Sequence, residues 1–251
     1  MFPAMSGLSG NPWLVGVDGC RGGWLAAFVR ADGDDCALGV FPRFADIGAE
    51  PRRPAVIAVD MPIGLPARTG IGGRAAENAV RPLLGARQSS VFSVPSRAAM
   101  AATDYREACR IAQDTSDPPR KVSKQLFNIA PKIREVDAAL RADAALASHT
   151  FEVHPEVAFW RLNGERALAE PKKMKSRPYP PGLALRRELL EAAGLPRALA
   201  QGTPPRGAAE DDLIDALACA AIARRLHRGE AVPFPDPPPR DEFGLPMAIW
   251  A

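Results

Sequence analysis

Several features that would quickly assign a protein to a class are scarce in this sequence. Its 251 residues include only four cysteines, at Cys20, Cys36, Cys109 and Cys219. They are widely spaced and form no paired pattern of the kind that binds zinc. This spacing excludes a cysteine-based metal motif, and we expect the protein to occupy a reducing, cytoplasmic environment.

An excess of one charge and a long apolar run are also lacking. The net charge is only +3, which excludes a highly basic protein that coats DNA, so any nucleic-acid contact must use a local patch. No run approaches the ~18 apolar residues needed to span a membrane. The opening MFPAMSGLSGNP has no charged segment followed by an apolar one, so we expect no signal peptide and no membrane contact. The oligomeric state stays open, a homodimer included.

What the sequence does contain is ample apolar material and many prolines. It is 47% hydrophobic, enough for one large domain with a sizeable core. Its 26 prolines are most concentrated in PKKMKSRPYPPG and VPFPDPPPRDEFGLP. The first predicts an exposed basic loop that needs no partner. The second predicts an extended tail, about residues 229–251, anchored on the domain by Phe234, Phe243 and Trp250.

The pattern of apolar runs and turns predicts an α/β protein. WLVGVDG, GWLAAFVR and CALGVF are separated by Gly and Asp turns, which is typical of three antiparallel strands. RRPAVIAVDMPIG and TFEVH predict a fourth and a fifth strand, and helical patterns fill most of the region between them and after them. We expect a single domain, 1–251, with a mixed sheet and a helical insertion at about 66–149, in which Pro131 kinks or divides a long helix.

Two carboxylates end predicted strands. Asp18 closes the first and Asp60 the fourth. If these strands are parallel neighbours about 4.8 Å apart, both side chains reach the carboxyl edge of the sheet, where α/β proteins commonly bind ligands. Each could also be an ordinary turn residue.

The helix EDDLIDALACAAIA, residues 210–223, carries two further carboxylates in an almost wholly apolar stretch. Asp212 and Asp215 are three residues apart and share a helix face. Asp212 could be only a cap, as Asp211 is expected to be, but capping explains Asp215 poorly because it lies beyond the first turn. The small residues Ala216, Cys219 and Ala223 would let the helix lie close to the sheet.

Four carboxylates at one point would repel one another, and divalent cations would relieve that repulsion. The pattern therefore predicts Mg²⁺ or Mn²⁺ as cofactor. Two such ions about 3.5–4 Å apart can clamp the attacking and leaving oxygens of a phosphodiester.

These motifs resemble a known family. VGVDG, IAVDMPIG and DLIDALACA are similar, in order, to the acidic motifs of ribonuclease-H-like nucleases, and the last to the terminal helix of RuvC-type resolvases. With GVDGCRGGW, RQSSVFSVPSR, KQLFNIAPKIREVD and FEVHPEVAFW, the chain resembles domain-of-unknown-function family 429, described as predicted nucleases of the ribonuclease H-like fold. The resemblance implies the strand order 3-2-1-4-5 and a metal-binding catalytic set of Asp18, Asp60, Asp212 and Asp215. Asp60 stands where resolvases usually have Glu, and the insertion is larger than theirs.

Other residues are weaker candidates. Glu152 and His154 share one side of the fifth strand, so Glu152 could bind metal and His154 could transfer protons; a turn before the next helix explains them equally well. Arg87, Ser89 and Arg97 in GARQSSVFSVPSRAAM suit phosphate contact at the rim of the carboxylate cluster, although a solvated loop explains them too.

The leading functional prediction is a metal-dependent nuclease that hydrolyses phosphodiester bonds of DNA or RNA. One alternative is a phosphotransferase or ATPase of the actin–hexokinase type, whose core opens with a similar Asp-Gly turn. The chain shows no repeated core, which that type requires. The other alternative is a non-catalytic nucleic-acid-binding protein that kept the fold, against which the four intact acidic residues argue.

Overall fold

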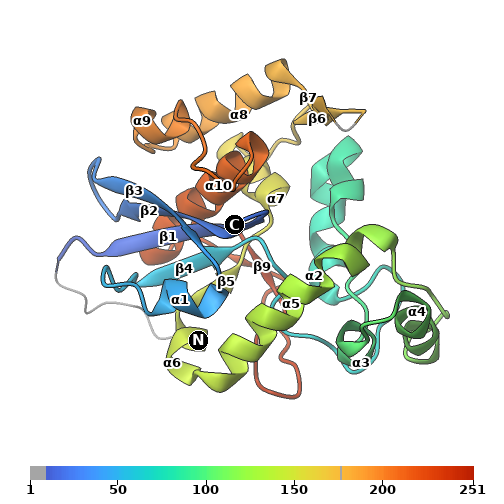
Figure 1. The fold of residues 1–251 in the computed structure, drawn as a ribbon. Helices are drawn as coiled ribbons and strands as arrows, with labels where there is room; N and C mark the ends of the chain where they lie inside the picture. Colours follow the sequence, from blue (N-terminus) through green and yellow to red (C-terminus); the bar gives the residue numbers. More distant parts are fainter. Residues whose placement is uncertain (1–9, 176) are drawn as a thin grey trace.

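The computed structural model describes residues 10–175 and 177–251. They form a central sheet of five strands with helices on both faces (Figure 1). The strands are Trp13–Cys20 (β1), Gly23–Arg30 (β2), Cys36–Phe41 (β3), Val56–Val59 (β4) and Thr150–Glu152 (β5). Their spatial order is β3-β2-β1-β4-β5, with β1–β2 and β2–β3 antiparallel and β1–β4 and β4–β5 parallel. The predicted mixed sheet and its order are confirmed.

Successive side chains of each strand point to opposite faces of the sheet, and this divides the hydrophobic core into two clusters. Leu14, Val56 and Ala58 face one side of the sheet, whereas Val15, Val17 and Val59 face the other. Most strand residues of β1, β2 and β4 are buried. Both faces are therefore covered, as the unbroken apolar content of the fourth strand predicts.

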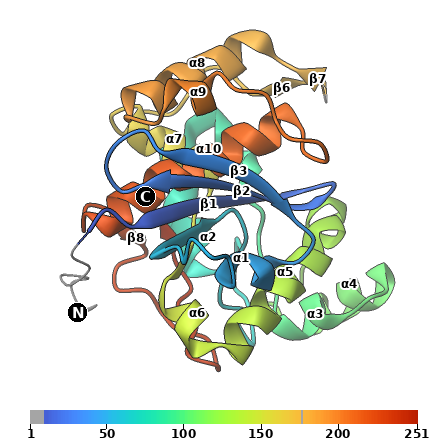
Figure 2. The ribbon, with the colours of Figure 1, turned by 60° about the vertical axis from the view of Figure 1, so that its left-hand side comes forward.

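The first face is covered by Glu210–His227 (α10), Pro155–Leu162 (α7), Pro180–Ala192 (α8) and Arg197–Ala200 (α9) (Figure 2). The helix α10 lies directly on β1. A Cβ atom added at Gly16 would come 2.0 Å from the Ala216 carbonyl oxygen and 2.1 Å from the Ala220 amide nitrogen. No side chain fits at Gly16, and the alanines of α10 permit the same approach from their side.

The insertion between β4 and β5 is helical, as predicted. It contains Ala75–Val80 (α2), the 3-10 helix Arg81–Ser90 (η1), Arg97–Ala101 (α3), Tyr105–Asp114 (α4), Lys124–Ala142 (α5) and Ala144–Ser148 (α6). With Phe44–Gly48 (α1), the helices α3 to α6 cover the second face, while α2 and η1 join the first core. Of the two effects expected of Pro131, a kink or a division, the division does not occur, because α5 continues through this residue.

The C-terminal tail lies on the domain, as predicted, but Phe243, one of its three predicted anchors, is 48% exposed. The tail pairs Pro233–Phe234 (β8) with Ile249–Trp250 (β9). Phe234 packs edge-on against Trp160, and Trp250 against Phe151. A further short hairpin joins Lys173–Met174 (β6) to Arg177–Pro178 (β7). In the described part of the chain, no helix combines the length and the apolar content needed to cross a membrane.

Candidate functional site

Asp18 and Asp60 are neighbours because of the register of β1 and β4. Val17 pairs with Val59 in the parallel ladder, and the Asp60 amide donates to the Val17 carbonyl at 2.9 Å. Asp18 lies on the same side of the sheet as Leu14, and Asp60 on the same side as Val56 and Ala58. Both carboxylates therefore face the layer that contains α10. The expectation that strands 1 and 4 would bring these residues together is confirmed.

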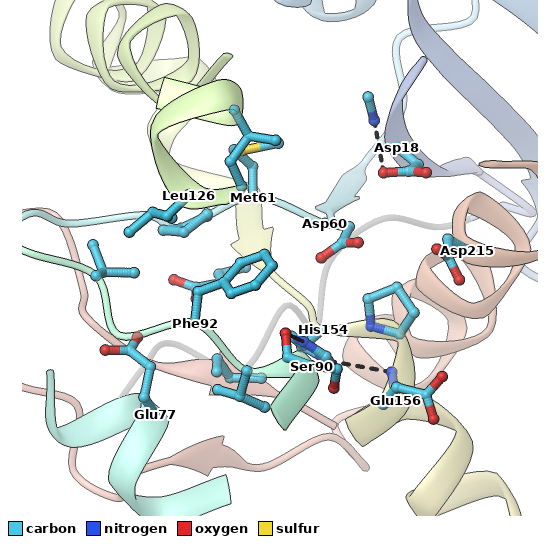
Figure 3. A pocket seen from close by; sticks show the side chains of 18 of the residues that line it. Asp18, Asp60, Met61, Glu77, Ser90, Phe92, Leu126, His154, Glu156 and Asp215 are labelled. Atoms are coloured by element: carbon cyan, nitrogen blue, oxygen red, sulfur yellow. Dashed lines mark hydrogen bonds between the residues drawn. The ribbon is translucent and has the colours of Figure 1, made fainter. Parts of the chain in front are cut away.

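The close packing of α10 on β1 brings Asp215 to the same place. Figure 3 shows the Asp18, Asp60 and Asp215 carboxylates directed toward a common space at the carboxyl edge of the sheet. All three line one cavity of about 530 Å³. Its opposite wall is apolar and includes Met61, Phe92 and Leu126, the first from the loop after β4 and the last from α5. The cavity therefore joins an acidic half to an apolar half.

Burial and mutual repulsion raise the pKa values of these carboxylates. Burial, followed by the negative charge of Asp215, raises the pKa of Asp60 to about 8. Burial, with the charges of Asp60 and Asp215, raises the pKa of Asp18 well above its ordinary value. The pKa of Asp215 is raised by burial too, although Lys172 opposes that shift. A carboxylate cluster of this kind favours a cationic ligand.

One lysine partly supplies the missing charge. The Lys172 Nζ atom is ion-paired with the Asp215 Oδ2 atom. Burial alone would lower the pKa of Lys172, but the negative charge of Asp215 raises it above the ordinary value. Next to it, Lys173 is paired with Asp211 at 2.5 Å. The expectation that PKKMKSRPYPPG is only a solvated loop is therefore wrong, because its first two lysines point to the acidic end of α10.

Asp212, which we expected to bind metal, serves as a helix cap in the structure. Its Oδ2 atom accepts the amide of Ala209, the residue before α10, at 2.8 Å. Among the described residues lining the cavity, α10 contributes Asp211 and Asp215 but not Asp212. The structure thus brings together three of the four predicted carboxylates and places Asp211, expected to be the cap, at the cavity instead.

Glu152 lies in the cavity wall but is fully engaged with the protein. Arg74 donates to both of its oxygens, at 2.6 and 3.0 Å, and the Ile63 amide donates to one of them at 2.7 Å. Arg74 also bonds Glu77 and the carbonyl oxygens of Ile63 and Gly64. Burial would lower the pKa of Arg74, but Glu152 and Glu77 raise it. This network fixes the loop after Asp60, and sequence reasoning missed it because Arg74 lies 78 positions from Glu152.

His154 also lines the cavity, where both of its ring nitrogens have partners. Nδ1 accepts the Glu156 amide at 3.2 Å, which makes His154 the N-cap of α7, and Nε2 lies 3.3 Å from the Ser90 carbonyl oxygen. These partners assign the neutral ring with its proton on Nε2. Burial lowers the pKa of His154, which favours the same neutral form. Nearby Glu156 is bound by both oxygens to the buried Arg186.

The segment RQSSVFSVPSR borders the cavity, although not through the residues that were predicted to bind phosphate. Ser90, Val91, Phe92 and Val94 line it, whereas Arg87, Ser89 and Arg97 do not. Arg97 is paired instead with Asp137 and Asp241 at 2.5 Å each and with Glu242 at 3.0 Å, so it ties the insertion to the tail. Sequence reasoning missed Phe92 as a cavity residue, because an apolar residue in a polar segment equally indicates a contact with the core.

The donor set is suited to a hard divalent cation. It consists of carboxylate oxygens, and the buried Oδ1 atom of Asp215 has no hydrogen-bond partner. Among the described residues, however, no three His, Cys, Asp or Glu side chains form a preorganised metal site. Lys172 is bonded to Asp215 in this arrangement. The chemical type of these residues therefore fits a cation, and the ammonium group of Lys172 occupies part of the position that the cation would take.

Comparison with known proteins identifies the family. The family model described as "Protein of unknown function (DUF429)" matches residues 16–240. The chain belongs to this family. The matched region includes Asp18, Asp60, Asp215 and Lys172. No curated protein and no solved structure matches the chain.

Proposed function

We propose that this DUF429 protein is a metal-dependent hydrolase of phosphodiester bonds in nucleic acid. The observation that supports this most strongly is the convergence of three buried carboxylates, from β1, the end of β4 and α10, in one cavity. The raised pKa values of these carboxylates mean that the surrounding protein does not by itself compensate their negative charge. Buried charges without an opposite charge beside them cost folding free energy. Proteins retain them where a bound ligand supplies the opposite charge.

Asp18, Asp60 and Asp215 would hold Mg²⁺ or Mn²⁺ through their oxygens, as part of a coordination shell completed by water. The cation supplies positive charge beside the scissile phosphate and makes a water molecule more acidic. The Asp215 Oδ1 atom has no partner and could take the cation while Oδ2 keeps Lys172. The ammonium group of Lys172 lines the same cavity, where it can donate hydrogen bonds to a phosphate oxygen.

The apolar half of the cavity suits the other part of a nucleotide. Met61, Phe92 and Leu126 form a wall facing the carboxylates (Figure 3). An aromatic ring such as that of Phe92 offers a stacking surface to any base. A volume of about 530 Å³ lies within the range of small-ligand cavities, so the cavity takes an unpaired nucleotide or a strand end rather than a duplex.

The two alternatives find less support. A phosphotransferase of the actin–hexokinase type needs two related half-domains, and the described residues contain one five-stranded sheet of this topology. A protein that only binds nucleic acid has no need for three repelling carboxylates, because they oppose the approach of phosphate unless a cation is present.

The test is a panel of single-stranded, double-stranded and branched DNA and RNA, incubated with Mg²⁺ or Mn²⁺. We expect cleavage of at least one substrate and a loss of about 10²–10³-fold or more in Asp18→Asn, since losing one electrostatic contact to the transition state costs this much in other enzymes. Asp35→Asn, the same change at an exposed aspartate, is the control. Absence of metal-dependent cleavage, or undiminished cleavage by Asp18→Asn, would reject the proposal.

A further inference from the structure

A second cavity adjoins the first. It has a volume of about 470 Å³ and shares Val91, Phe92 and Val94 with the carboxylate cavity. The segment that contains these three residues therefore borders both. Ser89 and Ser93 of the same segment line the second cavity only, whereas Ser90 lines only the first.

The two cavities have opposite charge. The described residues that line the second include no Asp or Glu; it presents two cations, Arg120 and Lys121, with five hydroxyl groups and an amide. The hydroxyl and amide groups belong to Thr69, Ser89, Ser93, Ser116, Ser123 and Gln125. Among the described residues, seven carboxylates and four cations line the first cavity, so its formal charge is negative. Cations among hydroxyl donors form the lining that phosphate oxygens require.

The backbone that carries the cations is anchored. The buried Ser116 hydroxyl accepts the amide of Arg120 at 2.8 Å. The Thr69 amide donates to the Thr115 carbonyl oxygen, and the Asp117 amide to the Thr69 carbonyl oxygen, both at 3.0 Å. These bonds fix the loop between α4 and α5 against the chain that follows β4. The exposed side chains of Arg120 and Lys121 thus extend from a fixed support.

The start of α5 adds to this positive field. Ser123 caps the helix, and both Ser123 and Gln125 line the cavity. The first turn of this 19-residue helix has no acidic residue, whereas α4 and α10 begin with Glu107 and with three acidic residues, respectively. The positive end of the helix dipole is therefore not neutralised by its own side chains.

We propose that the second cavity binds phosphate groups of the same nucleic-acid strand whose scissile phosphate lies at Asp18, Asp60 and Asp215. This inference rests on the proposed function. The strand passes over Val91–Val94, with a base beside Phe92 and the adjoining phosphates against Arg120 and Lys121. The substrate class is therefore a single strand, held outside the carboxylate cavity by contacts that do not read its sequence.

The test compares two double variants that remove the same charge. One is Arg120→Gln with Lys121→Gln. The control is Arg197→Gln with Arg206→Gln, at exposed arginines that line neither cavity. Binding of a fluorescent oligothymidylate is measured by anisotropy at several salt concentrations in EDTA, so that no strand is cleaved.

We expect the first variant to bind about tenfold more weakly, and its slope of log K against log salt to fall by about 1.4, since each phosphate contact contributes about 0.7 for single strands. The control should retain the affinity and slope of the wild type. Equal affinities and slopes in the two variants, or no binding of the oligonucleotide by the wild type, would overturn the proposal.

Inorganic phosphate, added as a competitor, tests whether the ligand of the second cavity is a nucleic-acid strand or a small phosphate compound. If phosphate binding depends on Arg120 and Lys121 while oligonucleotide binding does not, the strand assignment is wrong. Because this assay measures binding, its result is independent of the cleavage panel. A strand that binds through Arg120 and Lys121 without being cut supports the subsite and rejects the hydrolase.

Discussion

Two clusters of buried charge line the same cavity, and they are built differently. Around Arg74, each charged group has partners: the guanidinium bonds Glu152, Glu77 and two carbonyl oxygens. Around Asp215, three carboxylates share a single lysine, and the Asp215 Oδ1 atom has no partner. The first cluster is complete within the chain, and the second is not.

This difference distinguishes the residues that support the structure from the residues of the candidate site. A satisfied buried network holds the loop after β4 in place and needs nothing from outside. A cluster with excess negative charge costs folding free energy unless a ligand neutralises it. We therefore assign Glu152 to the support and Asp18, Asp60 and Asp215 to the proposed chemistry, although all four line one cavity.

Breaking the satisfied cluster should have the largest effect on stability. Arg74→Met leaves Glu152 and Glu77 buried without their cation, and we expect a loss of about 3–5 kcal/mol in the free energy of unfolding, measured by urea denaturation. Arg110→Met is the control, because Arg110 also pairs with two carboxylates, Glu107 and Asp114, but on the surface. There water screens the pairs, and little change is expected. Equal losses in both variants would contradict the comparison.

Completing the unsatisfied cluster should stabilise the protein. A cation that binds only the folded state adds about 2.7 kcal/mol at a concentration one hundred times its dissociation constant. Mn²⁺ or Mg²⁺ should therefore raise the melting temperature of the wild type. Asp215→Asn should lose most of that rise, because it removes one carboxylate from the set. An identical rise in both proteins would show that Asp215 is not a ligand.

For each pH unit, the pH dependence of the metal-free protein gives a smaller effect, and its sign is known. The Asp60 pKa is about 8 in the folded chain and about 3.9 in an unfolded one. Between these values the folded state holds a proton that the unfolded state has released. Stability should consequently fall by about 1.4 kcal/mol per pH unit as pH rises through this window, and the Asp60 contribution should level off above it. Urea denaturation in EDTA across this range measures the slope.

Asp60→Asn is the matched variant for that measurement. It keeps the shape of the side chain and cannot titrate, so the part of the slope due to Asp60 should disappear. A slope that is unchanged in Asp60→Asn would mean that Asp60 ionises normally in the folded protein, and the account of the unsatisfied cluster would then be wrong for this residue.

The smallest expected effect distinguishes a cap from a ligand. Asp212→Ala removes the acceptor for the Ala209 amide, which should cost about 1 kcal/mol in the free energy of unfolding. The melting-temperature rise produced by Mn²⁺ should be the same as in the wild type. A lost metal response would restore Asp212 to the metal-binding set that the family resemblance implies.

Much of the fold follows from local patterns. The apolar strands, the helical insertion and the anchored tail all follow from residues close together in the chain. Three of the four predicted carboxylates also converge in the structure. They could be predicted because the strand ends and an apolar helix with an internal Asp are visible in the sequence. The errors at the site are Asp212, the lysine loop and the placing of Arg87, Ser89 and Arg97 at the carboxylate cluster. They concern residues for which a local pattern allows more than one role.

The sequence by itself determined that Asp18 and Asp60 end strands and that Asp215 lies in a buried helix. Alternation along strands and periodicity along helices decide such positions. Only the tertiary structure decided which charges are neutralised. Lys172 meets Asp215 across 43 positions and Arg74 meets Glu152 across 78. Pairings over such distances depend on how the layers pack, and no spacing in the chain records them.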